Sequence, residues 1–286
     1  MALLTPADVR RLLAAHGVHP RKARGQNFVV DPNTVRKVVR DAGVGDGDVV
    51  CEVGPGLGSL TLALREAGAR VVAVEIDEAL ARALAEVVAG DVGVRIVQAD
   101  ALRVDLGAVT DEAARAWQAA DAPRLLVANL PYNVATPILM EALATRAFAR
   151  ILVMVQKEVG RRWAAQPRDE LYGAVSVKVA AQADVRVAAQ VSRSAFHPVP
   201  NVDSVTVRLE PRPWAWPVER EALFRLVEAG FAQRRKRLRN SLSRADLAPA
   251  AVEDALERAG LDAGARAEEL AVAQWVALAG ELQRGG

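Results

Sequence analysis

The sequence predicts an α/β fold, with a doubly wound parallel sheet followed by a small all-α C-terminal domain. Three observations point to it. Short apolar runs alternate with helical patterns up to residue 156, the first of these runs ends in a glycine-rich turn, and everything beyond residue 217 reads as helical. Strands that are apolar along their whole length are buried on both faces, as in a parallel sheet covered by helices.

The strands and helices of the expected sheet follow one another in regular order. Apolar, β-branched runs of five to seven residues read as strands, and longer runs with helical spacing read as the crossovers between them. The acidic and Ala-rich stretch 107–123 is expected to be a loop. The expected strands are 48–53, 70–76, 94–100, 124–130 and 150–156, and the expected helices are 59–68, 78–90 and 136–148.

The later part of the chain reads differently. Residues 171–210 alternate between polar and apolar, so we expect the sheet to end in antiparallel strands. The segment PRPWAWP at 211–217 then breaks the pattern with three prolines. We therefore expect one domain over residues 1–212, including a basic N-terminal arm, and a helical domain over residues 213–286.

Length and composition bound the class of protein. With 286 residues, of which 51% are hydrophobic, the chain can bury a large core. No apolar run reaches 18 residues, and charged residues interrupt the N-terminal segment where a signal peptide would be apolar, so we expect a cytoplasmic protein without membrane contact. The single cysteine, Cys51, reads as a core residue, and with only three histidines we expect neither a disulfide nor a metal site.

Basic residues cluster in two places, although the net charge is only +2. The first 40 residues hold eight Lys and Arg against two acidic residues, and residues 234–244 hold six basic residues and no acidic one. Such clusters fit nucleic-acid phosphates, and the alternative is a solvated helix face. The candidate RNA-binding residues are Arg21, Lys22, Arg24, Arg234, Arg235, Lys236, Arg237 and Arg239.

Three successive strand ends carry residues suited to a nucleotide-like cofactor. Gly54 and Gly56 follow the first strand, where missing side chains let backbone N–H groups approach a ligand at a helix N-terminus. Glu75 ends the second strand and is placed to accept hydrogen bonds from a ribose diol. At the third strand end, Asp100 can accept from an adenine amino group and Ala101 offers an apolar contact, although Asp100 also suits a helix N-cap. This pattern fits NAD or S-adenosylmethionine.

The fourth strand ends in Asn129-Leu130-Pro131-Tyr132. An exocyclic amine of adenine is a poor nucleophile because its lone pair is delocalised into the ring. The side-chain oxygen of Asn129 and the Leu130 carbonyl can accept its two hydrogens and so orient the lone pair at a methyl sulfonium, while Tyr132 stacks on the base. Pro131 stiffens the loop. Positioning and electrostatics then carry the rate without a special general base, and the alternative is a surface turn.

These motifs resemble the ribosomal RNA adenine N6-dimethyltransferase family, of the bacterial small-subunit type. The resemblance rests on NLPY at 129–132, on ExGxGxG at 52–58 and on four further segments in the same order, from about residue 20 to about residue 280. Val29 departs from the family, which usually has Leu there. The four further segments are GQNFVVD (25–31), MVQKEVGRR (154–162), SAFHPVPNVDSVTVRL (194–209) and FAQRRKRLRNSL (231–242).

The resemblance implies a Rossmann-like methyltransferase that uses S-adenosylmethionine, releases S-adenosylhomocysteine and needs no metal. It implies that Phe196 faces Tyr132 across a flipped adenine, and that the substrate is a pair of adjacent adenines near the 3′ end of 16S rRNA in the small ribosomal subunit. We expect the enzyme to be a monomer. The cofactor contacts carried over from the family are Asn27, Val29, Gly54, Glu75, Asp100 and Asn129.

Three other functions remain to be weighed against this one. A large-subunit (23S) rRNA adenine methyltransferase that confers antibiotic resistance is disfavoured by the 234–242 segment and the C-terminal extension. A non-catalytic ribosome assembly factor is disfavoured by the intact NLPY motif. An NAD-dependent dehydrogenase is disfavoured because the third glycine falls one residue early for G-x-G-x-x-G.

Overall fold

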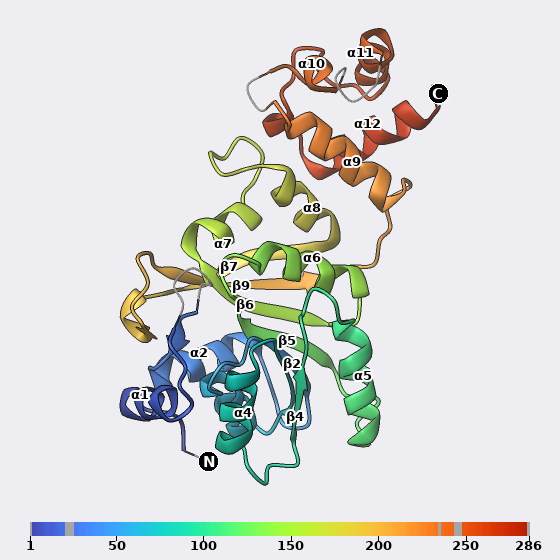
Figure 1. Ribbon diagram of the computed structural model, residues 1–286. Coiled ribbons are helices and arrows are strands. Elements are labelled where there is room, and N and C mark those ends of the chain that lie inside the picture. The colour runs from blue at the N-terminus through green and yellow to red at the C-terminus, as the bar shows by residue number, and fades with distance from the viewer. Residues whose placement is uncertain (1, 21–25, 234–235, 243–247, 285–286) are drawn as a thin grey trace. The chain divides into compact units, whose positions relative to one another are not determined.

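The computed structural model describes residues 2–20, 26–233, 236–242 and 248–284 (Figure 1). The chain folds into two compact units. The first unit comprises Met1–Gly160 and Arg186–Pro211, and the second comprises Arg161–Val185 and Arg212–Gly286. This division differs from the expected one at residue 212 because residues 161–185 pack with the C-terminal segment. Each unit is described by itself below.

A seven-stranded mixed sheet organises the first unit, in the order β4-β3-β2-β5-β6-β9-β7. The five strands from β4 to β6 are parallel, and β9 runs antiparallel to β6. The expected parallel sheet with antiparallel strands at its end is therefore confirmed. The strands are β2 (Val49–Val53), β3 (Arg70–Glu75), β4 (Val94–Gln98), β5 (Arg124–Asn129), β6 (Arg150–Gln156), β7 (Ala183–Val191) and β9 (Ser204–Pro211).

The crossover helices return the chain between parallel strands. Strand order reverses after β4, so right-handed crossovers place α3 and α4 on one face of the sheet and α5 and α6 on the other. Contacts between α2 and α3 and between α5 and α6 agree with this arrangement. The crossover helices are α3 (Ser59–Glu66), α4 (Glu78–Val87), α5 (Leu106–Ala116) and α6 (Ala135–Thr145), while α2 (Pro32–Ala42) precedes β2 and α7 (Lys157–Trp163) follows β6.

Helix α5 corrects the expected loop at 107–123. Asp105 is its N-cap, and the carboxylate accepts the Ala108 N–H at 2.9 Å. Leu106, Ala113 and Ala114 are buried along one side. Alanine favours helices intrinsically, and a capped start with an apolar face is enough to form one, so the acidic residues belong to an exposed helix face.

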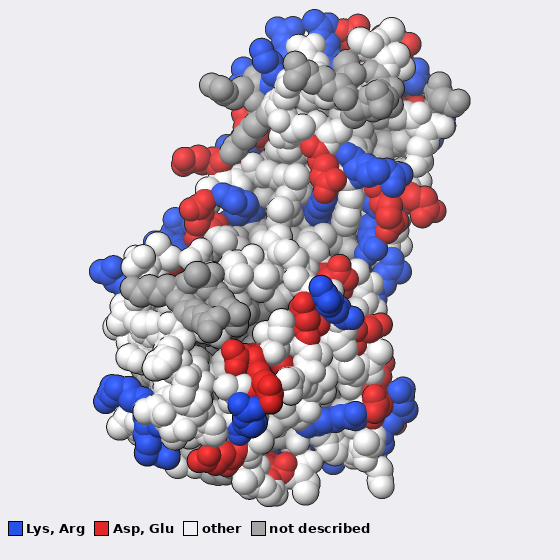
Figure 2. Space-filling view, viewed as in Figure 1, with Lys and Arg blue, Asp and Glu red and all other residues white. Residues whose placement is uncertain are grey.

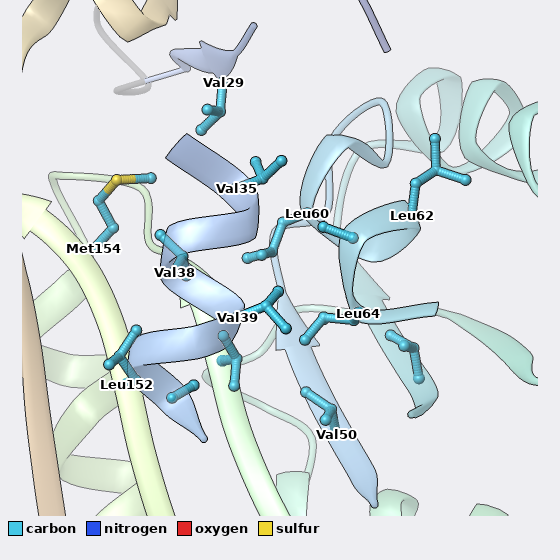
Figure 3. Packing of buried hydrophobic residues seen from close by; sticks show 14 of the residues in the cluster. Val29, Val35, Val38, Val39, Val50, Leu60, Leu62, Leu64, Leu152 and Met154 are labelled. Atoms are coloured by element: carbon cyan, nitrogen blue, oxygen red, sulfur yellow. The ribbon is translucent and has the colours of Figure 1, made fainter. Parts of the chain in front are cut away.

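The core of the first unit lies between α2, α3 and the sheet. Figure 3 shows Val35, Val38 and Val39 of α2 lying between Leu60 and Leu64 of α3 and the strand residues Val50, Leu152 and Met154. Each of these side chains is at most 5% exposed. Their spacing along α2 puts them on one face of the helix, which fixes α2 against the sheet. Cys51 is fully buried, as expected, and burial raises its pKa to about 12.

A short two-stranded ribbon joins distant segments of the first unit. Strand β1 (Phe28–Val29) pairs antiparallel with β8 (Phe196–His197), with Val29 opposite Phe196. Helix α1 (Pro6–Ala15) begins at a capping box formed by Thr5 and Asp8. The ribbon brings the N-terminal segment to the edge of the sheet where the strands end.

The second unit is helical, but it begins earlier than expected. Helix α8 (Ala174–Gln182) occupies part of the 171–210 segment that was expected to be strand. Ser176 explains the difference, because its hydroxyl accepts the Gly173 N–H at 3.1 Å at the start of the helix and donates to the Arg162 carbonyl at 2.5 Å. The other helices surround the buried Trp275 and are α9 (Arg220–Phe231), α10 (Leu238–Leu242), α11 (Pro249–Arg258) and α12 (Val272–Arg284).

Among the described residues, no helix combines the length and the apolar character needed to cross a membrane.

Candidate active site

A cavity of about 560 Å³ lies at the carboxyl ends of the parallel strands in the first unit. Strands β2, β3, β4 and β5 each contribute residues at their ends, and the segment leading into β1 contributes from the N-terminal side. This convergence is expected from the topology, because parallel strands end at one edge of a sheet. Among the predicted site residues, the cavity is lined by Asn27, Val29, Gly54, Gly56, Glu75, Asp100, Ala101, Asn129 and Pro131.

A hydrogen bond joins the glycine turn after β2 to the end of β3. The Gly56 N–H donates to Glu75 Oε2 at 3.1 Å, and the Asp77 N–H donates to Glu75 Oε1 at 3.0 Å. Glu75 is only 5% exposed, and burial raises its pKa while these two N–H donors lower it. The carboxylate is therefore held in one position and keeps free lone pairs, which is the arrangement needed to receive hydroxyl groups of a ligand.

Gly56 allows a close approach that a side chain would prevent. Its φ is +58°, and a Cβ there would lie 2.9 Å from Cε1 of Phe28. Gly54 also has positive φ, and a Cβ there would lie 3.5 Å from Cδ of Pro131. The turn therefore packs closely against both the N-terminal segment and the loop after β5. The glycines are needed for this packing as well as for the close approach of a ligand.

The ends of β3 and β4 offer a partly apolar slot. Ile76 and Leu102 are 64% and 38% exposed, and both line the cavity together with Ala101. Asp100 accepts the Leu102 N–H at 3.0 Å and lies 3.6 Å from Arg103. No α-helix starts at Asp100, so its carboxylate is not the N-cap that was weighed as the alternative. Exposed apolar side chains beside a carboxylate suit a planar heterocycle with an amino group.

The side-chain amide of Asn129 has a hydrogen-bond partner at its nitrogen and none, among the described residues, at its oxygen. Its Nδ2 donates to the Asn27 carbonyl at 2.9 Å, across 102 residues of sequence. A carbonyl oxygen only accepts, so the amide nitrogen must face it and the oxygen must point away. That Oδ1 is buried and has no hydrogen-bond partner among the described residues. A buried acceptor without a partner costs about 1–3 kcal/mol, which a bound N–H donor would recover.

Tyr132 lies on the same loop but is turned toward β9. Its hydroxyl and that of Ser204 are 2.8 Å apart, and the ring is partly buried. Burial raises the pKa of Tyr132 and the Ser204 contact lowers it. Tyr132 does not line the cavity, whereas Asn133 and Val134 do. Leu130 is buried, and its N–H donates to the Met154 carbonyl at 3.1 Å.

Phe196 lies in the core rather than at the cavity. It is 1% exposed and packs in the cluster that contains Val29 and the α2 valines. The expected arrangement, with Phe196 facing Tyr132 across a base, is therefore not the arrangement of these side chains. The role of Phe196 as a wall of the acceptor site stays a prediction and requires a change in the β1–β8 ribbon.

Several residues that line the cavity were not predicted to be site residues, and three of them bear on its chemistry. Phe28 lies against Gly56, Ile76 forms part of the slot, and Glu52 is buried with its Oε2 accepting the Thr61 hydroxyl at 2.6 Å. Burial raises the pKa of Glu52 to about 8. An exposed isoleucine directly after Glu75 is a signal that sequence analysis could have used. The other two depend on contacts that only the fold creates.

The predicted RNA-binding residues can be placed only in part. Arg21, Lys22, Arg24, Arg234 and Arg235 lie outside the described residues. Lys236 and Arg237 are exposed, whereas Arg239 pairs with Glu253. Figure 2 shows basic and acidic side chains interspersed on the displayed face of each unit. Lys236 and Arg237 are therefore better placed than Arg239 to meet phosphates.

The fold and the cavity together define the class of protein. The strand order with an antiparallel strand beside β6, the glycine turn fastened to Glu75, and the slot at Asp100 make this an S-adenosylmethionine-dependent methyltransferase with a Rossmann-like fold. The partly apolar slot beside Asp100 fits the adenine end of such a cofactor, and Asn129 lines the same cavity. Among the described residues, no group of three or more His, Cys, Asp or Glu side chains gathers to hold a metal.

Family models and relatives make the assignment specific. The ribosomal RNA adenine dimethylase model matches residues 18–284, and the chain belongs to that family. Ribosomal RNA small subunit methyltransferase A of Thermobifida fusca is 51% identical over 281 residues, covering 97% of this chain and 95% of the relative. The protein of the same name from Streptomyces griseus is 50% identical, covering 97% and 94%.

Solved structures share the fold. A dimethyladenosine transferase from Plasmodium falciparum matches with a TM-score of 0.75 at 22% identity, over 91% of this chain and 98% of that chain. The 23S rRNA methyltransferase ErmE matches with a TM-score of 0.64 at 28% identity, over 90% and 100%. The identity to the small-subunit relatives is thus well above the identity to the large-subunit structure.

Proposed function

We propose that this protein transfers methyl groups from S-adenosylmethionine to N6 of two adjacent adenines in the 3′-terminal hairpin of 16S rRNA, making N6,N6-dimethyladenines during small-subunit biogenesis. The observation that carries the proposal is Asn129, which lines the cavity and whose buried Oδ1 has no hydrogen-bond partner among the described residues. Family membership and about 50% identity to small-subunit methyltransferases support the choice of substrate.

The acceptor amine is positioned by the loop after β5. Asn129 Oδ1 accepts one N6–H of the adenine and the Leu130 carbonyl accepts the other, which directs the nitrogen lone pair at the methyl group. When bound, the cofactor supplies that methyl group on a sulfonium. The Asn27 carbonyl holds the amide nitrogen of Asn129, so the side chain presents its oxygen to the substrate. Positioning of this kind replaces the entropy of an encounter in solution.

Two methylations require a tolerant acceptor site. After the first transfer, the amine has one hydrogen left, so a grip that needed both acceptors would stop at monomethyladenine. We infer that one acceptor is dispensable in the second round. The Asn129 oxygen is the better candidate for the essential one, because it has no competing partner among the described residues.

The cofactor occupies the cavity along the strand ends. Glu75 receives the ribose hydroxyls, Asp100 receives the adenine amino group, and Ala101 and Ile76 bracket the adenine ring, with Asn27, Val29, Gly54 and Gly56 contributing contacts around it. Hydrogen bonds from Gly56 and Asp77 to Glu75 support this role, because they fix the carboxylate before a ligand arrives. We further propose a monomer that acts in the cytoplasm without a metal ion.

The second unit and the N-terminal arm bind the ribosomal particle. The candidate contacts are the basic residues of 21–24 and 234–239, of which Lys236 and Arg237 are exposed in the described part of the chain. A methyltransferase acting on 23S rRNA is the nearest rival. The lower identity to ErmE, 28% against 51% for the small-subunit relative, favours the small subunit.

One experiment tests donor, acceptor and product count together. The protein is incubated with methyl-labelled S-adenosylmethionine and either unmodified small subunits or unmodified large subunits, and the labelled nucleotides are mapped. We expect four methyl groups on two adjacent adenines of 16S rRNA and none on 23S rRNA. Label on 23S rRNA, or on one adenine with a single methyl, would contradict the proposal.

A further inference from the structure

The loop between β8 and β9, residues 198–203, carries two exposed apolar side chains. Val199 is 54% exposed and Val202 is 46% exposed. The loop is the gold segment at the left of the first unit in Figure 1. It follows directly after Phe196–His197 and leads into Ser204, whose hydroxyl meets that of Tyr132. The loop therefore ends beside a residue that contacts Tyr132 of the loop after β5.

Local hydrogen bonds hold this loop in place. The Asp203 carbonyl accepts the Lys157 N–H at 3.0 Å, and Asp203 Oδ1 accepts the Arg193 N–H at 3.2 Å. Pro200 is buried between the two exposed valines. A proline on either side of Val199 also restricts the backbone. The valines are thus presented to solvent by an anchored segment, although apolar side chains at a free loop tip would ordinarily fold inward.

Two basic residues contact the end of this loop through their backbone. Lys157 and Arg193 form no side-chain hydrogen bond or ion pair with a described residue, and each anchors the loop only through its backbone N–H. The nearest acidic side chain on the loop is Asp203, and one of its oxygens is taken by the Arg193 N–H. Exposed apolar side chains on a loop held by two basic residues suit a nucleic acid strand, because cations meet phosphates and apolar groups enter the base stack.

We propose that residues 198–203 form an apolar wedge, in which Val199 and Val202 fill the gap left in the rRNA hairpin when the target adenine is extruded. The inference rests on the proposed function, because it needs a base that leaves its stack. Enzymes that act on a base must take it out of the stack, and architectural proteins insert apolar side chains between base steps. Lys157 and Arg193 then bind the phosphates on either side of the step.

The test compares a double substitution of the two loop valines with a single substitution of an exposed valine elsewhere. Val199→Ser with Val202→Ser removes the wedge, and Val92→Ser is the matched control, since Val92 is 89% exposed near the amino end of β4, at the edge opposite the cavity. The substrate is an unmethylated small subunit that carries 2-aminopurine beside the target adenines. Fluorescence of 2-aminopurine rises when its neighbour leaves the stack and is not replaced by another base.

We expect the unaltered protein to raise the fluorescence and the double variant to leave it near the level of the free particle. The double variant should also lose roughly 10- to 100-fold in kcat/KM for methyl transfer, because no apolar side chain then offsets the free energy needed to take the adenine out of its stack. Its cofactor Kd and melting temperature should match those of the unaltered protein, as should every property of Val92→Ser.

A double variant with unchanged fluorescence response and unchanged kcat/KM would overturn the wedge, as would an equal loss in Val92→Ser. Failure of the proposed function looks different, because the unaltered protein would then transfer no methyl to the particle. The fluorescence measurement needs no cofactor and still reports on the wedge in that case. A response in the unaltered protein that the double variant abolishes would support the wedge, and a response shared by both would overturn it.

Discussion

The proposed site has a cofactor half and an acceptor half, which differ in how many of their polar groups already have hydrogen-bond partners without a ligand. In the cofactor half, both oxygens of Glu75 already accept backbone N–H groups, and the glycine turn is fixed between Phe28 and Pro131. In the acceptor half, Asn129 Oδ1 has no partner among the described residues, Tyr132 is turned to Ser204, and Phe196 is buried.

This difference indicates which ligand each half needs. The cofactor half is preorganised, so binding there costs little rearrangement. In the proposed acceptor half, Asn129 Oδ1 has no partner among the described residues, and the rings of Tyr132 and Phe196 pack against other parts of the unit. We propose that the RNA base completes this half. We therefore expect substitutions in the cofactor half to change cofactor affinity, and substitutions in the acceptor half to change the methyl-transfer rate.

The largest effect is expected from Asn129→Ala. Removing the acceptor that orients N6 should lower kcat by about 100- to 1,000-fold, as loss of one positioned hydrogen-bonding group does in other enzymes. Single-turnover transfer to unmethylated small subunits measures the rate, and calorimetry measures the cofactor Kd, which should change little. Asn33→Ala, at an exposed position on α2, is the control. A near-normal rate would remove Asn129 from the mechanism.

Two substitutions of Tyr132 separate the contribution of its ring to kcat/KM from that of its hydroxyl. Tyr132→Ala should lower kcat/KM roughly 5- to 150-fold, because base–aromatic stacking contributes about 1–3 kcal/mol per base. Tyr132→Phe keeps the ring and loses only the contact with Ser204, so its kcat/KM should fall by no more than about 5-fold, since a neutral hydrogen bond contributes about 1 kcal/mol. Equal losses in both variants would mean that the hydroxyl, and not the ring, matters.

Gly56→Ala should act on the cofactor half alone. The added Cβ would lie 2.9 Å from the Phe28 ring and push that ring from the cavity wall, and overpacking of this kind costs about 1–3 kcal/mol, so the cofactor Kd should rise roughly 5- to 150-fold. Gly90→Ala is a matched control, because φ there is +79° and no atom lies within 4 Å of the added Cβ. Calorimetric titration compares the two. A similar rise in Kd for Gly90→Ala would show that only global stability is being measured.

The raised pKa of the buried Glu52 makes the free energy of unfolding depend on pH. Burial raises its pKa from 4.5 to about 8, so the folded protein holds this proton more tightly than the unfolded chain does. The stabilisation from that proton is complete below about pH 4.5 and is lost as the pH rises to about 8. Glu52→Gln should therefore be more stable than the unaltered protein at pH 8 by about 1–3 kcal/mol and gain little at pH 4.5. Urea unfolding at both pH values measures this, and equal differences would contradict it.

The smallest effect is expected at the basic residues of the second unit. Lys236→Ala with Arg237→Ala should reduce the slope of log K against log salt by about 1.4–1.8, as expected for two lost phosphate contacts. Arg239→Ala should change the slope less, because its guanidinium pairs with Glu253. Particle binding at several salt concentrations measures both. A larger change in the slope for Arg239→Ala would show that Arg239, rather than Lys236 and Arg237, contacts the phosphates.

The sequence predicts the frame of the site well for a physical reason. Runs such as 48–53 and 70–76 can only be buried strands, and parallel strands place Glu75, Asp100 and Asn129 on one edge. The helix at 106–116 was missed because its acidic, Ala-rich composition resembles a loop, and α8 was missed because its valines alternate.

The contacts between distant segments lie beyond sequence reasoning. The Asn129–Asn27 hydrogen bond spans 102 residues, and the packing of Phe28 on Gly56 depends on where the β1–β8 ribbon lies. No spacing in the sequence encodes either contact. The burial of Phe196 is different, because the residues alone favour a core position for a phenylalanine and only the family resemblance places it against a base.

The most direct test is the distance between Asn129 Oδ1 and N6 of the target adenine. It can be measured in a structure of the protein bound to the 3′-terminal rRNA hairpin and S-adenosylhomocysteine. We predict a separation of about 3 Å, with Nδ2 still donating to the Asn27 carbonyl. An adenine whose N6 lies beyond about 4 Å from Oδ1, or an Asn129 amide that has turned its oxygen away from the base, would contradict the account.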